Sequence, residues 1–504
     1  MSHREILEAL SGLLLVLFIA VMSGTVVATA LPTIVGALNG TQSQYTWIVT
    51  ATLLAATAST PIWVKLADLF NKKAMVQAAI VVFVVGSFAS AFAPNIGELI
   101  AARAVQGVGV GGLQALVQIV IASMISPRER GRYNGYLGAV IAIATVSGPL
   151  LGGLIVDTSW LGWRWCFAIG VPIAAIAFVV LHKTLHLPTV KREATVDYLG
   201  AGLIAGGVSL LLIWVSFVDR SFGWLTWQTA VMVGAGLLIL AAAVLVESRA
   251  REPVVPLGIV RRRTTALAIV ASLAVGMAMF GGAVFLGQYF QVGRGYSPTE
   301  AGLLTVPMMA GLLVSSTVAG RLITRTGVIK PYIVVGTLTL VAGFAMLALI
   351  DHRTSLVYVG IGMALVGVGV GMSMQNLVLA VQNAVPQRDI GAASGTLTFF
   401  RSLGGTIGVS VLGAVLAHRV TASLTDSFAK AGLPAPSAGG AGGNLNLDTL
   451  PAAVRTIVRV AYGDATGHIF LVSVGVGLVG VLAALLLPRI TLRTSLDIEQ
   501  KPGS

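Results

Sequence analysis

Two arginines, Arg103 and Arg401, lie near the middle of long runs of apolar residues. A guanidinium at the centre of a bilayer costs about 2.5–3.5 kcal/mol on insertion scales, so each side chain should face other protein groups or a wet cavity. Gln106 and Gln114 follow Arg103 at helical spacing and share its face of the helix. A cation beside two amides suits polar or anionic groups, so this face predicts the wall of an aqueous path. The alternative is an arginine that only anchors a helix end.

Glycines recur close to these positions. Gly107 to Gly112 fits the pattern G-x-G-x-x-G, but a dinucleotide site needs a preceding strand, and this segment lies inside an apolar run. Its spacing instead predicts close packing of helix backbones. A second group, Gly148, Pro149, Gly152 and Gly153, removes one backbone hydrogen bond and permits bending. This group predicts a hinge at a moving interface, with a static kink as the alternative.

The composition is that of a membrane protein. Of 504 residues, 56% are hydrophobic and only 10% are charged, with a mean hydropathy of +0.91, whereas soluble domains carry about 25% charged residues. The net charge of +13 comes from Lys and Arg in short loops, which argues against a nucleic-acid partner. The single cysteine, Cys166, excludes an internal disulfide and a cysteine-built metal site. We expect no metal and no cofactor.

Fourteen apolar runs are long enough to cross a bilayer core, which needs about 20 residues per helix. We expect helices near 10–36, 46–69, 74–93, 97–125, 131–157, 165–182, 199–218, 229–248, 264–291, 300–323, 331–350, 355–384, 389–418 and 464–487. With a cytoplasmic N-terminus, 22 of the 32 Lys and Arg residues fall on the cytoplasmic side and eight on the other. This bias predicts a plasma or inner membrane protein with both termini in the cytoplasm.

A helix pair is repeated within the chain. Gly107 to Gly111 returns as Gly367 to Gly371, and Gly148 returns as Gly408, always 260 residues later. The fourth expected helix thus matches the twelfth, an offset of eight helices, so two helices are inserted between two six-helix halves. The predicted fold is an all-α polytopic membrane protein with two pseudo-symmetric bundles.

The expected domain boundaries follow from this repeat. They are an N-terminal bundle at 1–190, two inserted helices at 191–258, a C-terminal bundle at 259–488 and a cytoplasmic tail at 489–504. Residues 420–463 are rich in Gly, Ala and Pro, which predicts a long exterior loop. The first apolar run continues past Ala30, which argues against a cleaved signal peptide.

Four motifs occur in order along the chain. They are Thr25 to Pro32 in the first helix, Lys65 to Lys73 after the second, Arg103 to Gly107 in the fourth and Gly148 to Gly153 in the fifth. Together they resemble the motifs of the fourteen-helix drug:proton antiporters of the major facilitator superfamily. The resemblance implies export of amphipathic compounds in exchange for protons by alternating access.

The chain departs from this family at the first-helix position whose carboxylate would carry protons. Ser23 stands where the family's first helix usually has an aspartate, and none of the nineteen acidic residues is clearly at mid-membrane. Two hypotheses follow. The proton carrier is a carboxylate near a helix end, for which Asp157, Asp68 and Asp464 are candidates, or the cavity is cationic and favours neutral or anionic substrates.

The candidate residues fall into three groups. We expect the substrate cavity to be lined by Ser23, Thr25, Arg103, Gln106, Gln114, Gln288, Gln375, Phe399 and Arg401. A conformational latch is expected from Asp68, Lys72, Lys73 and Arg128, and a hinge from the Gly148 to Gly153 group.

The expected function is secondary active export, because no ATP site is visible in the sequence. The partners would be a small-molecule substrate, protons and the lipid bilayer, and the expected state is a monomer. An uptake carrier for a specific metabolite and a non-transporting receptor on the same fold are the alternatives. An enzyme is not expected, since the sequence shows no catalytic cluster.

Overall fold

The computed structural model describes residues 3–124, 130–185, 198–217, 226–250, 257–386, 390–430 and 451–489. The first half contains α1 (His3–Ala37), α2 (Gln42–Leu69), α3 (Lys72–Phe92), α4 (Ile96–Met124), α5 (Arg130–Asp157), α6 (Trp165–Ala168) and α7 (Gly170–Thr184). Next come α8 (Tyr198–Phe217) and α9 (Trp227–Arg249). The second half contains α10 (Leu257–Val260), α11 (Arg263–Gln288), the π-helical turn η1 (Tyr289–Gly293), α12 (Pro298–Leu304), α13 (Val306–Thr326), α14 (Lys330–Leu347), α15 (Leu356–Ala384), α16 (Ile390–Lys430) and α17 (Ala452–Leu486).

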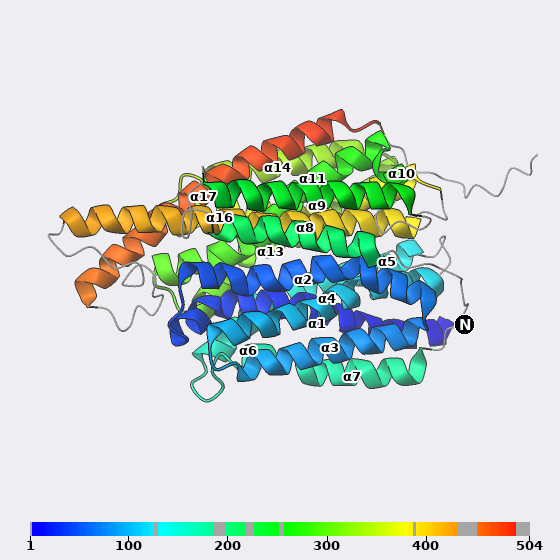
Figure 1. The fold of residues 1–504 in the computed structure, drawn as a ribbon, viewed down its shortest axis with the longest axis horizontal. Coiled ribbons are helices and arrows are strands. Elements are labelled where there is room, and N and C mark those ends of the chain that lie inside the picture. The colour runs from blue at the N-terminus through cyan, green and yellow to red at the C-terminus, as the bar shows by residue number, and fades with distance from the viewer. Residues whose placement is uncertain are drawn as a thin grey trace, which may run out of the picture.

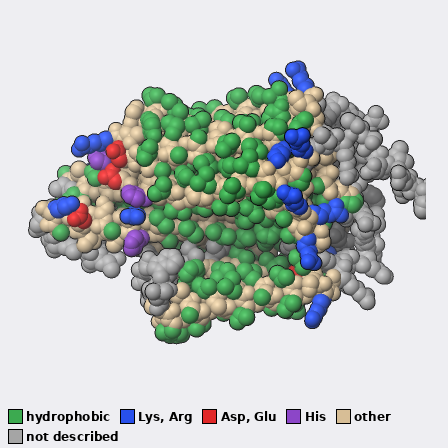
Figure 2. Space-filling view, turned by 90° about the horizontal axis from the view of Figure 1, so that it is seen from above, with side chains coloured by type: hydrophobic (Ala, Val, Ile, Leu, Met, Phe, Trp, Pro, Cys, Tyr) green, Lys and Arg blue, Asp and Glu red, His purple; other side chains and the backbone are tan. Residues whose placement is uncertain are grey.

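Helix lengths agree with a membrane fold. Among the described residues, twelve helical segments are long and apolar enough to cross a bilayer, and α5 and α8 contribute shorter apolar stretches. An apolar belt surrounds the middle of the molecule, while charged side chains gather at its two ends (Figure 2). The predicted helical membrane fold is confirmed; the count of fourteen crossings stays a prediction.

Local sequence signals define several helix ends. Thr41 begins α2 with a capping box, in which the Thr41 hydroxyl accepts from the backbone of Gln44 and the Gln44 side chain accepts from the backbone of Thr41. Ser297 and Glu300 form the same arrangement before α12. Gly327 ends α13 with a φ of 70°, a backbone conformation that glycine adopts without strain.

One end of the bundle is strongly basic, and we call it the basic end. The cations at the helix ends that meet there include Lys72, Lys73, Lys183, Arg261, Arg262, Arg263, Arg321, Arg325 and Lys330. Several of these cations bind carbonyls at the C-terminal ends of helices. Lys330 Nζ donates to Leu485 (2.7 Å), and Arg262 Nη1 donates to Ala384 (3.0 Å). Such contacts satisfy carbonyls that have no partner within their own helix.

The two halves repeat the same helix pairings. In the first half α4 packs on α2 and α3, and α5 packs on α1; in the second, α15 packs on α13 and α14, and α16 packs on α11. Ser59 Oγ donates to Val108 (3.3 Å), and Ser315 Oγ donates to Val368 (3.1 Å), in corresponding places. The repeated glycines lie at these contacts and let the helix backbones approach closely, as the sequence spacing predicts.

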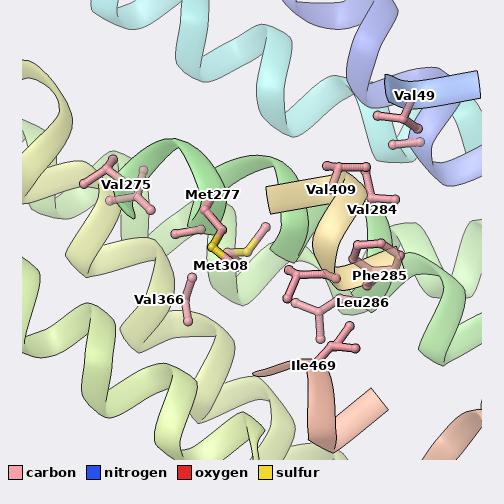
Figure 3. Close-up of a cluster of buried hydrophobic side chains, with 14 of the residues drawn as sticks. Val49, Val275, Met277, Val284, Phe285, Leu286, Met308, Val366, Val409 and Ile469 are labelled. Carbon is pink, nitrogen blue, oxygen red and sulfur yellow. The ribbon is translucent and has the colours of Figure 1, made fainter. Parts of the chain in front are cut away.

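The second half packs around α11. Met277 and Val284 of α11 lie near Met308 of α13 and Val409 of α16 in a buried apolar cluster (Figure 3). Gly408 of α16 packs against Met277, so the two helices approach closely at mid-length. This close contact fixes the orientation of α16 and of the side chains that it carries.

Helices α8 and α9 lie beside the junction of the halves. Gly207 of α8 packs on Leu240, and Gly236 of α9 packs on Leu211, so the pair is held together by small-residue contacts. Helix α8 also contacts α2 of the first half and α16 of the second (Figure 1). The pair therefore covers one side of the junction.

Helices α16 and α17 project far beyond the bundle at the end opposite the basic end (Figure 1). We call this the hairpin end. The predicted loop at 420–463 is too long, because α16 continues to Lys430 and α17 begins at Ala452. Val420, Leu424 and Phe428 are buried at helical spacing and give the projection its own apolar contacts. With 41 residues, α16 is about 61 Å long, roughly twice the thickness of a bilayer core.

Candidate functional site

Buried amides join the two halves at the hairpin end. Gln42 of α2 and Gln288 of α11 exchange hydrogen bonds, and Gln42 Nε2 donates to Gln288 Oε1 at 3.2 Å. Both side chains are at most 3% exposed. The Tyr462 hydroxyl of α17 donates to Gln42 Oε1 (3.4 Å), which links a third helix to the pair. Because buried amides are costly when unpaired, these bonds favour contact between the halves here.

Further hydrogen bonds extend this contact around α1 and α2. The Tyr45 hydroxyl donates to the carbonyl of Val284 (3.0 Å), and the hydroxyls of Thr50 and Ser410 lie 3.1 Å apart. Gln291 Nε2 donates to the carbonyl of Thr29 (2.6 Å). All of these bonds join the first half to the second near the hairpin end.

On the other side of the junction, α5 packs against α12. A Cβ added to Gly153 would lie 2.5 Å from the Cα of Thr299, and one added to Gly302 would lie 2.5 Å from the carbonyl oxygen of Pro149. Asp157 Oδ2 accepts a hydrogen bond from the backbone N–H of Thr299 (2.9 Å). Only glycine permits so close an approach of two backbones.

We call this group of contacts the hairpin-end seal. Its residues are Gln42, Tyr45, Thr50, Gly153, Asp157, Gln288, Gln291, Thr299, Gly302 and Ser410.

Toward the basic end, helices α1 and α11 carry more exposed residues than they do at the seal. On α1, Phe18 and Val21 are partly exposed and Gly24 is exposed with an open space at its Cβ position, whereas residues 26–32 are all buried. On α11 residues 284–293 are likewise all buried, while Val270 and Leu273 are partly exposed. The junction is therefore closed over the hairpin end, and α1 and α11 are more accessible toward the basic end.

A small cavity lies within the junction, just inside the seal. It is lined by Thr25, Ala28, Thr29, Pro149, Ala283, Gly287, Ala301, Thr305 and Met309. The volume open to the centre of a water molecule is about 10 Å³. The cavity therefore has room for about one water. In this conformation the cavity is too small for an amphipathic organic compound.

Arg103 is enclosed within the first half. Its side chain is 3% exposed, and Nη1 donates to Gln106, whose Nε2 donates to Ser87 Oγ of α3 at 2.8 Å. The guanidinium also lies 5.8 Å from the ring centroid of Phe167. Arg103 and Gln106 therefore form a closed polar group among α3, α4 and α6 in this conformation.

Arg401 has different surroundings. Its side chain is partly exposed, although it lies about three turns from the N-terminal end of a long apolar helix. It forms no hydrogen bond and no ion pair within the part of the chain that the structure describes, and its nitrogens are not fully buried. The adjacent Phe399 is buried and lies edge-to-face with Phe400 at 5.2 Å. Of the two arginines, only Arg401 can meet a ligand here.

The other expected cavity residues divide by exposure. Ser23 is buried and bonds within its own helix, to the carbonyl of Ala20. Thr25 is partly exposed and contacts the carbonyl of Ala144 on α5 (3.4 Å). Gln114 is partly exposed and Gln375 is exposed, while Gln288 belongs to the hairpin-end seal.

The expected latch is only partly described. Lys73 Nζ donates to the carbonyl of His182 at the end of α7 (2.5 Å), a contact within the first half. Lys72 begins α3 beside it. The side chain of Asp68 and the whole of Arg128 lie outside the described residues.

Two of the proton-coupling candidates lie at the hairpin end. Asp157 belongs to the seal, and Asp464 Oδ1 lies 2.7 Å from His352 Nδ1, with both side chains partly exposed. The nearby Asp351 carboxylate accepts from the Thr354 hydroxyl and the Arg353 backbone, which lowers the pKa of Asp351. These carboxylates can meet water at the hairpin end while the junction is open toward the basic end.

The expected hinge group lies against two neighbours. Gly148 and Gly152 face Thr25 and Val26 of α1, while Pro149 and Gly153 face α12 of the other half. The group thus combines packing within the first half with contact across the junction.

Most residues of the seal were not predicted from the sequence. A signal existed, because Gln42, Tyr45, Thr46 and Thr50 form a polar stripe at helical spacing along α2. Gln288 and Gln291 form a matching pair one turn apart. Polar stripes at the same end of two apolar helices indicate a shared interface.

The paired amides give a first prediction. Replacing Gln42 by Leu leaves the buried amide of Gln288 without its partner, which should destabilise the sealed state by about 1–3 kcal/mol. The thermal unfolding midpoint of purified protein should fall. In the double variant Gln42→Leu with Gln288→Leu, no amide is left unpaired, so much of the loss should be recovered. Purely additive losses would show that the two amides are energetically independent.

Comparisons with known proteins agree with this architecture. Residues 13–409 match the family described as the Major Facilitator Superfamily. The multidrug transporter protein MdtP of Bacillus subtilis (strain 168) is 34% identical over 427 residues, covering 85% of this chain and 78% of that protein. The efflux pump dotC of Dothistroma septosporum is 32% identical over 502 residues, covering 98% of this chain and 85% of that one.

A solved structure has the same fold. It is that of a bacterial homologue of the human lysosomal transporter Spinster, in an inward-facing and unoccupied conformation. The TM-score is 0.67 at 14% identity, and the match covers 97% of this chain and 98% of that one.

Proposed function

This chain belongs to the Major Facilitator Superfamily, and we propose that it exports amphipathic small molecules across a cell membrane by alternating access. Its relatives include a multidrug transporter and efflux pumps, and it is a transporter rather than an enzyme. We further propose that a proton gradient drives the export.

One observation carries the proposal. The junction of the two halves is closed by the hairpin-end seal and is more accessible toward the basic end. A transporter with one open and one closed end needs only to exchange these states to move a solute. The seal consists of side-chain hydrogen bonds across the junction and of close contacts between glycines and backbone. It can therefore separate without breaking either half.

We assign the basic end to the cytoplasm, because Lys and Arg concentrate in cytoplasmic loops. Both termini then lie in the cytoplasm, and the projecting hairpin lies outside. This orientation needs fourteen crossings, with α5 and α8 spanning the membrane as well. The described conformation then faces inward, ready to take a substrate from the cytoplasm or the inner leaflet, and the functional unit is a monomer.

Proton coupling in this proposal depends on a carboxylate near a membrane surface. Ser23 leaves the first helix without an aspartate, so Asp157 and Asp464 at the hairpin end and Asp68 at the basic end are the candidates. Asp157 is attractive because it bonds to the backbone of the other half. Protonation of its carboxylate would weaken that bond and favour opening of the seal.

The proposal is tested with purified protein in liposomes and an imposed pH gradient. Export of a fluorescent amphipathic dye should rise with the gradient and stop when an ionophore collapses it. Uptake that is indifferent to the gradient would instead identify a facilitator. A protein that binds compounds and moves none would be a receptor on this fold.

A further inference from the structure

Arg401 is an unpaired cation inside the membrane. The eleven helical steps from Ile390 to Arg401 correspond to a rise of about 16 Å, so Arg401 lies near half the depth of a core that is about 30 Å thick. A buried cation normally pairs with a carboxylate. Here the guanidinium has no such partner within the described residues, and its nitrogens stay accessible.

The orientation of α16 turns Arg401 away from lipid. The backbone of Arg401 packs against Gly276 of α11, and Gly404 and Gly408 on the following turns pack on the same helix. Ile407, which is 40% exposed, lies about 120° away around the helix. Side chains lean toward the N-terminus of their helix, so the guanidinium is directed toward the basic end, where α1 and α11 are more accessible.

Acidic groups are far from this position. The helices packed against α16 are α2, α4, α8, α11, α15 and α17. Their only acidic residues are Asp68 and Glu98, within two residues of a helix end, and Asp464, which pairs with His352 at the hairpin end. Among the described residues, no acidic group on these helices is therefore placed to balance the charge of Arg401.

We propose that Arg401 is an anion-binding subsite of the transport path, and that the preferred substrates are amphipathic compounds carrying a sulfonate, carboxylate or similar anionic group. This inference rests on the proposed export function. A bound anion supplies the missing counter-ion, and the neighbouring aromatic residue Phe400, which is partly exposed, offers an apolar surface to the rest of the compound.

This assignment has an electrical consequence. A monoanion leaving the cytoplasm moves down an inside-negative potential, which favours its accumulation outside by about fiftyfold per 100 mV. Export of the anion should thus respond to membrane potential in addition to any movement of protons.

The test uses two dyes that differ chiefly in one sulfonate. They are 1-anilinonaphthalene-8-sulfonate, an anion, and N-phenyl-1-naphthylamine, which is neutral. Binding to protein in lipid nanodiscs is measured by equilibrium dialysis for the native chain, Arg401→Gln, Arg401→Lys and the control Arg103→Gln. Export of both dyes is then measured in liposomes with each variant.

Arg401→Gln should weaken binding of the sulfonate by about 10- to 100-fold, since hydrogen bonds to charged groups carry that much affinity. Binding of the neutral dye should change less than about twofold. Arg401→Lys should keep most of the preference, and Arg103→Gln should leave it intact because Arg103 is enclosed. Equal losses for both dyes, or no loss for the sulfonate, would overturn the subsite. If the binding contrast holds and neither dye is exported, the export function fails while the anion site stands.

Discussion

Cross-linking positions 50 and 410 should stop transport almost completely. The hydroxyls of Thr50 and Ser410 lie 3.1 Å apart across the hairpin-end seal. A disulfide requires Cβ atoms about 3.5–4.5 Å apart. We expect two cysteine side chains in these places to reach that geometry. Thr50→Cys with Ser410→Cys, made in a Cys166→Ser background, should lose at least about tenfold in export when oxidised, because a covalent bond holds the seal shut.

The experiment contains its own controls. A reductant should restore export in the double variant, and each single cysteine variant should be insensitive to oxidation. The Cys166→Ser background removes the one native thiol, which is buried. Full export by a protein shown to be cross-linked would mean that the halves need not separate here, and alternating access at this seal would be wrong.

The opposite perturbation is a side chain placed where α5 meets α12. Gly153→Val inserts atoms within 2.5–2.7 Å of the backbone of Pro298 and Thr299. Backbone cannot move aside as a flexible side chain can, so overpacking should destabilise the sealed state by about 1–3 kcal/mol. The ratio of sealed to unsealed molecules should fall roughly 5- to 150-fold.

Accessibility measures this shift directly. Thr305 is 5% exposed and lines the small cavity just inside the seal. With Thr305→Cys as a reporter in the Cys166→Ser background, Gly153→Val should increase labelling by a membrane-impermeant thiol reagent applied from the hairpin end. Gly206→Val on α8 is the matched control, because nothing lies within 4 Å of its Cβ position. Unchanged labelling would show that the contact at Gly153 does not hold the seal.

The repeat was the most informative feature of the sequence. Gly107 and Gly367 lie 260 residues apart, and the structure places both at the same kind of close helix contact, against α2 and α13 respectively. Glycine positions predict helix contacts well, because the role of a glycine at such a contact depends on the backbone alone. Close backbone approach requires a missing side chain wherever it occurs, whatever the partner helix is.

The surroundings of the two arginines could not be read in the same way. Helices here are apolar on nearly all sides, so periodicity gives little indication of which face meets which neighbour. Arg103 and Arg401 look alike in the sequence, but one is enclosed with Gln106 and Ser87 and the other is open. That difference depends on α3 and α11, which are distant in the chain.

The loop at 420–463 was mispredicted for a related reason. Composition, with many Gly, Ala and Pro residues, outweighed the helical spacing of Val420, Leu424 and Phe428. Those residues are buried only because α17 returns beside α16, with Val458 buried as well. A contact between segments some 30 residues apart is not visible in a local window.

The projecting pair of helices turns small rotations into large displacements. Helix α16 is continuous from the seal at Ser410 to Lys430, a distance of about 30 Å. If the second half rotated by about 15°, as subunits do in other switching proteins, the tip would swing by roughly 8 Å. A spin label near Asp426 would therefore move by several ångströms when the second half rotates. Placed at the hairpin end, it reports which way the transporter faces without touching the path that the solute takes.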